Sequence, residues 1–185
     1  MKTSDFDYEL PEAAIAARPA EPRDAARLLV HEIGADRTRH LHVRDLPGLL
    51  AAGDLLVVND TRVRPARLLG RRGSGGALEI LLVEPLGGSR WRALVKPAKR
   101  LAEGEEFELE SGALRGVAVQ RPLGADGLPG PHWIVALRGG TRGDAAVEEL
   151  LERHGRMPLP PYLRKARGDS PEDPGDRERY QTVYA

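Results

Sequence analysis

At 185 residues the chain is long enough for one large domain or two small ones, and 41% of its residues are apolar, so it can form a hydrophobic core. It contains no cysteine, which excludes disulfide bonds, thiolate metal sites and a cysteine nucleophile. Its formal net charge is zero, so composition alone gives no global electrostatic argument for a nucleic-acid partner.

The first residues show no targeting pattern. Met1 is followed by KTSD rather than by a basic stretch and an apolar segment, so we expect no secretory signal. No apolar run approaches the roughly 20 residues that a membrane helix needs. We therefore expect a cytoplasmic protein with no membrane partner.

The N-terminal region predicts an entry segment followed by a β-hairpin. Within residues 1–22, the stretch 11–16 suits one or two helical turns, with proline in the first turn. Residues 27–33 and 39–43 are typical of strands, and residues 34–37 would form the turn between them.

Two histidines lie on the second of these strands. His40 and His42 are two residues apart and share a face of the strand, so a metal pair or a surface ladder would fit them. No third ligand is nearby, and we predict no metal site. Asp45 is a suitable cap for a short helix over 46–52.

The segment 53–72, GDLLVVNDTRVRPARLLGRR, is the most informative part of the chain. Its apolar run Leu55–Val58 predicts a buried strand, and 63–69 keeps strand-forming residues. Between them lies the polar cluster Asn59-Asp60-Thr61-Arg62. Such a cluster at the end of a rigid strand indicates a binding or catalytic loop, whereas an Asn-Asp turn that caps its own backbone is the structural alternative.

Positive charge is concentrated in residues 62–100. This stretch holds ten basic residues and two acids, for a net charge of +8. Such a block is expected of a protein that binds a phosphate backbone, and a solvated strand face is the alternative. Arginine outnumbers lysine 24 to 4, which favours phosphate recognition but also follows from codon usage.

Short strands separated by Gly- and Pro-rich turns predict a small antiparallel barrel over residues 62–142. Beyond the 63–69 segment, the expected strands are 77–83, 91–95, 105–110, 114–119 and 133–137.

Two turns of this region carry groups that suit an anion. The stretch Gly73–Gly76 offers main-chain N–H groups, but this signal is weak and a flexible hairpin turn is the favoured interpretation. Lys96, Lys99 and Arg100 surround Pro97 at the end of an apolar strand, where they form an anion site or protect the strand edge.

Helical character returns after the barrel. Asp144 is a suitable N-cap for a helix that ends at Gly155. We expect a rigid extended turn over 158–163, a mobile loop over 166–175 and a helix beginning at 176–180. No Ser/His/Asp arrangement or metal-ligand spacing identifies a reaction from the residues alone.

Seven stretches in chain order together resemble one family. They are DFDYELPEAAIA (5–16), RDAARLLV (23–30), GDLLVVNDTRVRPARL (53–68), GGALEILLVE (75–84), WRALVKPAKRLAEG (91–104), GRMPLPPYLRK (155–165) and DRERYQTVYA (176–185). They resemble the S-adenosylmethionine:tRNA ribosyltransferase-isomerases of queuosine biosynthesis, the QueA family.

The resemblance implies a fold and a reaction. The fold is an α/β domain, incomplete here, interrupted by a small antiparallel β-barrel domain; we assign 1–61 and 143–185 to the former and 62–142 to the latter. The reaction moves the ribosyl moiety of S-adenosylmethionine onto 7-aminomethyl-7-deazaguanine at the wobble position of tRNA and rearranges it to give epoxyqueuosine. S-adenosylmethionine is a co-substrate, and no cofactor is expected.

Length separates this chain from the family, whose members are about twice as long and continue with a PTAGLHF-type motif. We expect the chain alone to be inactive and to need a separate C-terminal half. Two alternatives stay open, a non-catalytic tRNA-binding module and a nonfunctional gene fragment.

The resemblance also suggests roles for individual residues. Asp60 is the candidate proton acceptor, because rearrangement of a ribosyl group next to a sulfonium needs proton abstraction. Its alternative role is to order the loop or to bind a hydroxyl group. The substrate-binding candidates are Asn59, Thr61, Arg62, Tyr162, Tyr180 and Gln181. The tRNA-binding candidates are Arg64, Arg67, Lys96, Lys99 and Arg100.

Overall fold

A computed structural model of the chain describes residues 1–139, 147–167 and 173–183, with the side chains of 164–166 left aside. Contacts divide the chain into two compact units. Unit 1 comprises Met1–Asp60, Leu159–Pro171 and Val183–Ala185, and unit 2 comprises Thr61–Pro158 and Glu172–Thr182.

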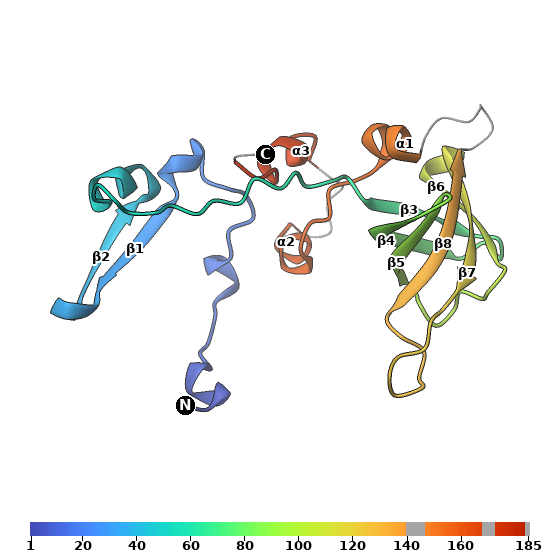
Figure 1. Ribbon diagram of the computed structural model, residues 1–185, viewed down its shortest axis with the longest axis horizontal. Helices are drawn as coiled ribbons and strands as arrows, with labels where there is room; N and C mark the ends of the chain where they lie inside the picture. The colour runs from blue at the N-terminus through green and yellow to red at the C-terminus, as the bar shows by residue number, and fades with distance from the viewer. Residues whose placement is uncertain (140–146, 168–172, 184–185) are drawn as a thin grey trace. The chain divides into compact units, whose positions relative to one another are not determined.

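Unit 2 is built around a closed antiparallel barrel (Figure 1). Its strands are β3 (Arg67–Arg72), β4 (Ala77–Gly87), β5 (Arg90–Lys96), β6 (Glu106–Leu109), β7 (Leu114–Gln120) and β8 (His132–Gly139). The order around the barrel is β3-β4-β5-β8-β7-β6, and β3 closes it by pairing with both β4 and β6. The barrel prediction is confirmed.

Alternation of side chains explains why these sequences form a barrel. On β5 every second residue is buried, beginning with Trp91, and the residues between face solvent. The same period of two on the other strands sends Ile80, Leu109 and Val135 into the interior, where all three are fully buried. The core of the described chain is therefore the interior of this barrel.

Two glycines permit the close strand approach that closure requires. A Cβ added at Gly70 of β3 would lie 2.0 Å from the main-chain oxygen of Glu108 on β6. A Cβ added at Gly116 of β7 would lie 2.5 Å from the ring of Phe107. Neither space could hold a side chain without movement of the backbone or of a buried ring.

Two short helices complete the described part of unit 2. Helix α1 (Val147–His154) buries Leu150 and Leu151 in the barrel core, and the expected helix is confirmed from Val147 onward. The cap expected at Asp144 lies outside the described residues. Helix α3 (Asp176–Arg179) confirms the helix expected at 176–180.

Unit 1 contains a two-stranded ribbon and several single helical turns. Strands β1 (Arg27–Glu32) and β2 (Arg37–His42) pair antiparallel, as expected, with Leu29 opposite His40. Turns of 3₁₀ helix cover Thr3–Phe6, Glu12–Ala14, Arg23–Ala25, Ile33–Ala35, Val43–Leu49 and, in unit 2, Glu110–Gly112. Helix α2 spans Pro161–Ala166.

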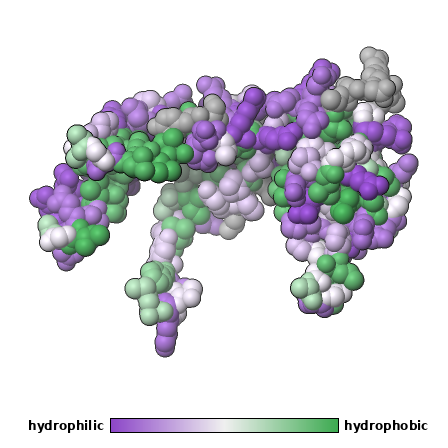
Figure 2. All heavy atoms as spheres, viewed as in Figure 1, coloured by the Kyte–Doolittle hydropathy of each residue, from purple (hydrophilic) through white to green (hydrophobic). Residues whose placement is uncertain are grey.

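The buried strand expected at Leu55–Val58 is wrong. These four residues are 88%, 54%, 82% and 46% exposed in chain order, and they belong to no strand. A strand is stable only when its backbone groups pair and its side chains are covered, and no described residue supplies either. Figure 2 shows other hydrophobic residues at the surface of unit 1 as well.

Three further expectations were also wrong. The helix expected over 46–52 is the 3₁₀ helix Val43–Leu49, in which Pro47 cannot donate the main-chain bond that an α-helix needs. The extended turn expected over 158–163 gives way to helix α2 at Pro161, since proline suits a first helical position. The strand expected from Val63 begins only at Arg67.

The predicted fold class is confirmed, an antiparallel barrel within a partial α/β protein. The assignment of residues to domains at 61/62 and 142/143 stays a prediction; the contacts place the first boundary between Asp60 and Thr61 and group α1 with the barrel.

Candidate functional site

The polar cluster Asn59-Asp60-Thr61-Arg62 lies where unit 1 gives way to unit 2. All four residues are exposed and have no regular secondary structure. Arg62 lies 3.7 Å from the carboxylate of Glu152 on α1. The candidate base Asp60 is exposed, so its carboxylate is accessible to solvent.

The segment after the cluster is held by Gln181. The side-chain oxygen of Gln181 accepts the main-chain N–H of Val63 at 2.7 Å, and its amide group donates to the carbonyl of Val63 at 3.2 Å. This reciprocal pair makes Gln181 a clamp on the backbone next to Arg62. The structure therefore gives Gln181 a partner of its own, and its expected role in binding substrate stays a prediction.

The returning chain fixes the next residues of the crossover. Arg67 and Arg156 exchange main-chain hydrogen bonds of 3.1 and 2.8 Å, which form a short antiparallel bridge. Gly155 packs so closely that an added Cβ would lie 1.9 Å from the carbonyl oxygen of Pro65. The polar cluster thus precedes a backbone that is rigidly anchored in unit 2.

The two tyrosines of the candidate set lie in different units. Tyr162 is on α2 in unit 1 and is 56% exposed. Tyr180 follows α3 in unit 2, is half-buried and donates its main-chain N–H to the carbonyl of Asp176 at 3.0 Å. Their expected contacts with a base stay predictions.

Two of the five cations expected to contact tRNA have partners within unit 2. Arg64 lies 5.3 Å above the ring of Trp91 and 3.8 Å from Glu148. Arg67 donates to Glu79 at 2.9 Å, and both side chains are largely buried. Arg67 is therefore held in the barrel wall by Glu79, because separating a largely buried guanidinium from its carboxylate is costly.

The other three form a free basic corner. Lys96, Lys99 and Arg100 are exposed at the end of β5 and in the turn after it, and their side chains form no ion pair with any described residue. The main-chain carbonyl of Arg100 accepts a hydrogen bond from Arg72, which ties this turn to the end of β3. We call these three residues the basic corner.

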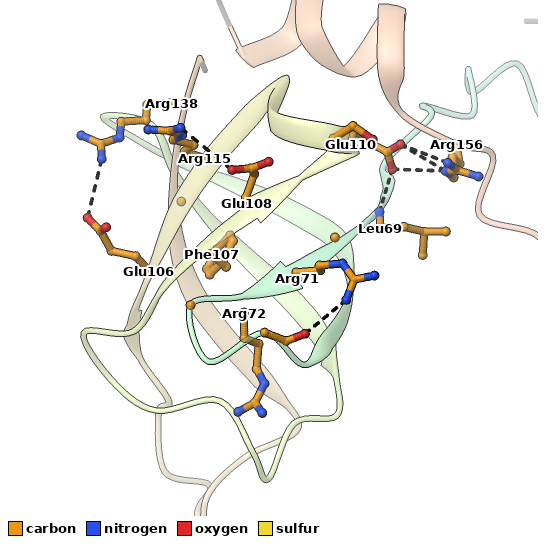
Figure 3. A pocket seen from close by; sticks show the side chains of 15 residues that line it. Leu69, Arg71, Arg72, Glu106, Phe107, Glu108, Glu110, Arg115, Arg138 and Arg156 are labelled. Atoms are coloured by element: carbon orange, nitrogen blue, oxygen red, sulfur yellow. Dashed lines mark hydrogen bonds and ion pairs between the residues drawn. The ribbon is translucent and has the colours of Figure 1, made fainter. Parts of the chain in front are cut away.

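A groove of about 640 Å³ runs along the outside of the barrel over β3, β6, β7 and β8 (Figure 3). Five arginines and three glutamates line it, together with glycines of the barrel wall: Arg71, Arg72, Arg115, Arg138, Arg156, Glu106, Glu108, Glu110, Gly70, Gly73, Gly75 and Gly116. Sequence reasoning missed this groove; the alternation of acids over 105–110 marked an exposed strand face but not its neighbours.

No group of three or more His, Asp or Glu residues in the described ranges is arranged to hold a metal ion. No helix among the described residues is long and apolar enough to cross a membrane.

One family of known proteins matches nearly the whole chain. The family described as "Queuosine biosynthesis protein" matches residues 3–185. This chain belongs to that family. The match includes both units, so it covers the polar cluster, the barrel and the segment that carries Gln181.

Full-length relatives are named S-adenosylmethionine:tRNA ribosyltransferase-isomerase. The relative from Phenylobacterium zucineum is 49% identical over 191 residues, which cover 100% of this chain and 51% of the relative. The relative from Gloeobacter violaceus is 45% identical over 183 residues, which cover 99% of this chain and 47% of the relative. The chain thus spans about half the length of the curated relatives it matches.

A solved structure is also similar in sequence. The crystal structure of an S-adenosylmethionine tRNA ribosyltransferase from Thermotoga maritima is 34% identical, and the match covers 89% of this chain and 54% of that one. The TM-score of 0.37 is low, so the family assignment depends on the sequence matches.

Proposed function

We propose that this chain supplies one half of an S-adenosylmethionine:tRNA ribosyltransferase-isomerase. The half would act in moving the ribosyl moiety of S-adenosylmethionine onto 7-aminomethyl-7-deazaguanine at the tRNA wobble position, with S-adenosylmethionine as co-substrate and no other cofactor. The observation that carries the proposal is the 45–49% identity to relatives so named over the whole of this chain. A cytoplasmic location belongs to the proposal, since tRNA is the substrate.

The exposed run Leu55–Val58 supports a missing partner. Four consecutive apolar residues are typical of a strand covered on both faces, yet each is at least 46% exposed. Covering one such side chain contributes roughly 1.5–3 kcal/mol. The occupant we propose is the part that corresponds to the second half of the relatives' length.

The polar cluster supports the chemistry. In the proposed reaction the amine of the aminomethyl group forms a bond to the ribosyl carbon, adenine and methionine leave, and a proton must be taken from the carbon next to the sulfonium. Asp60 is the carboxylate of the cluster that could accept it. Asn59, Thr61 and Arg62 would hold the ribosyl group beside it, because they precede the backbone that Gln181 anchors.

The test is a ribosyl-transfer assay on precursor tRNA. The chain alone should give no turnover, and the chain mixed with residues from the second half of the Phenylobacterium zucineum relative should give turnover. Turnover by the chain alone would disprove the expected inactivity. Absence of turnover from the mixture, with the two halves shown to associate, would count against the proposed function.

Two substitutions in this chain, each tested in the mixture, separate catalysis from association of the halves. Asp60→Asn should abolish turnover without weakening association, because it changes a carboxylate to an amide of the same size. Val57→Asp should weaken association, because it places a charge in the apolar run. Normal turnover by Asp60→Asn would remove Asp60 as the base.

A second candidate function is a tRNA-binding module, which the basic corner favours. Lys96, Lys99 and Arg100 are exposed cations with no acidic partner among the described residues. Phosphate contacts predict that the logarithm of affinity falls linearly with the logarithm of salt concentration. The variant K96A/K99A/R100A should weaken tRNA binding and flatten that dependence.

A further inference from the structure

The groove on the barrel's outer face has more positive than negative charge. Its five arginines and three glutamates give a net charge of +2. One ion pair in it is structural: Arg156 donates to both carboxylate oxygens of Glu110 at 3.1–3.3 Å, and Glu110 is only 9% exposed. This pair closes one end of the groove and is not free to bind a ligand.

Two other arginines of the groove are held by weak ion pairs. Arg115 lies 3.9 Å from Glu108, and Arg138 lies 3.6 Å from Glu106, with all four side chains about half exposed or more. Pairs so long and so exposed contribute about 0–1 kcal/mol. They can therefore exchange a carboxylate for another anion at little cost.

Arg71 has no acidic partner among the described residues. Its guanidinium donates only to the carbonyl of Gly75, at 3.4 Å, although Glu108 lies opposite it across the strand pair (Figure 3). Glu108 is nearest to Arg115 instead. The groove therefore holds one uncompensated guanidinium next to two loosely compensated ones.

The groove opens at the end of the barrel that carries the basic corner. The turn after β3 is joined to the start of β6 by Gly73, which donates to the carbonyl of Glu106 at 2.8 Å, and to the residue before β6 by Ser74, which donates to Glu105 at 3.2 Å. Arg72 reaches the carbonyl of Arg100 from the same strand end. An extended polyanion that contacts the basic corner would meet this groove next.

The lining favours a phosphate backbone over a protein partner. Protein interfaces are anchored by exposed aromatic or large apolar side chains, and here the one aromatic side chain, Phe107, is 4% exposed. The guanidinium fork of arginine matches phosphate oxygens. No exposed ring of the lining is available to stack on a base.

We propose that this groove binds the phosphodiester backbone of the tRNA through Arg71, Arg115 and Arg138. The inference rests on the proposed function, because that function supplies the polyanion. The contacts would position the tRNA without reading its sequence. They would extend the tRNA-binding surface from the basic corner along the barrel wall.

The test measures binding of the full chain to two unmodified tRNAs with different anticodons, by filter binding between 50 and 200 mM salt. Loss of three phosphate contacts should reduce the steepness of the plot of log affinity against log salt by about 2 to 3. Between 50 and 200 mM salt, the fold-loss of affinity should therefore be about 20 times smaller for R71A/R115A/R138A than for the parent chain. Both tRNAs should respond equally.

A matched variant and a reversed one control this result. R90A/R92A/R153A removes as much charge from exposed positions that do not line the groove, and it should have a smaller effect. E106Q/E108Q should tighten binding, which loss of folding could not imitate.

The outcomes separate this proposal from the proposed function. Unchanged binding by the groove variant, an equal effect of the matched variant, or no binding of tRNA by the parent chain would each overturn the groove assignment. If the mixture of halves is active and the groove variant binds tRNA normally, the proposed function holds and the groove assignment fails. If the groove variant loses tRNA binding and the mixture is inactive, the groove assignment holds and the proposed function fails.

Discussion

Gln181 offers a direct test of how the crossover segment is held. Its side-chain amide makes two hydrogen bonds to the main chain of Val63, one accepted at 2.7 Å and one donated at 3.2 Å. Each such bond contributes about 0.5–1.5 kcal/mol net, so Gln181→Ala should lower the local stability at Val63 by about 2 kcal/mol. Gln181→Glu keeps the acceptor, loses the donor and should fall between.

Hydrogen exchange at the Val63 amide reports this loss. A change of about 2 kcal/mol corresponds to exchange roughly 30 times faster. Gln120, an exposed glutamine at the end of β7, gives the matched control, and Gln120→Ala should leave the Val63 amide unchanged. An unchanged exchange rate in Gln181→Ala, or an equal change in Gln120→Ala, would refute the clamp.

This experiment also bears on the binding role expected of Gln181. A glutamine that binds substrate should matter for affinity while leaving the free chain unaltered. A glutamine that clamps Val63 should change the free chain first, since the segment beside Arg62 loses its anchor. Measuring exchange in the free chain separates the two roles.

Three further substitutions test the barrel unit. The main-chain N–H of Ala102 lowers the pKa of Glu105 below its ordinary value of 4.5, so Glu105 stabilises the fold above that value and its contribution is lost as pH falls through the lowered pKa. Glu105→Gln should therefore unfold at lower urea near pH 7 and differ less from the parent near pH 3. Gly155→Ala should cost about 1–3 kcal/mol in urea unfolding, because its Cβ would meet the oxygen of Pro65, and normal stability would contradict that packing. Glu110→Gln should cost about 1–3 kcal/mol, because it removes the carboxylate to which the Arg156 guanidinium donates, and a neutral result would make the pair dispensable.

The barrel could be predicted because its signal is local. On β5 the alternation from Trp91 to Val95 repeats every two residues, and the same residues are buried alternately in the structure. Helix α1 could be predicted for the same reason, since Leu150 and Leu151 mark its buried face. Patterns of this kind depend only on the chain's own geometry.

The crossover and the groove could not be predicted, because their contacts are distant in the sequence. The hydrogen bonds between Gln181 and Val63 join residues 118 positions apart, and no sequence pattern around Gln181 identifies Val63 as its partner. The groove needs the register of four strands, which brings Arg71 opposite Glu108 and Arg115 opposite Arg138. The helix at Pro161 was missed although a first-position proline is a local signal.

The exposed run Leu55–Val58 shows the limit of predictions from hydrophobicity. Apolar side chains indicate that burial is favourable, but they do not indicate which strands or helices cover them. All members of the hydrophobic core cluster in the described chain belong to unit 2, and of unit 1 only Leu159 and Leu163 are buried hydrophobic residues. The free energy of unfolding should therefore reside in the barrel, whereas the order of unit 1 should depend on the partner that covers this run. The polar cluster that the proposed chemistry needs lies at this boundary in the sequence: Asp60 is the last residue of its unit 1 segment, and Val63, in unit 2, is anchored by Gln181.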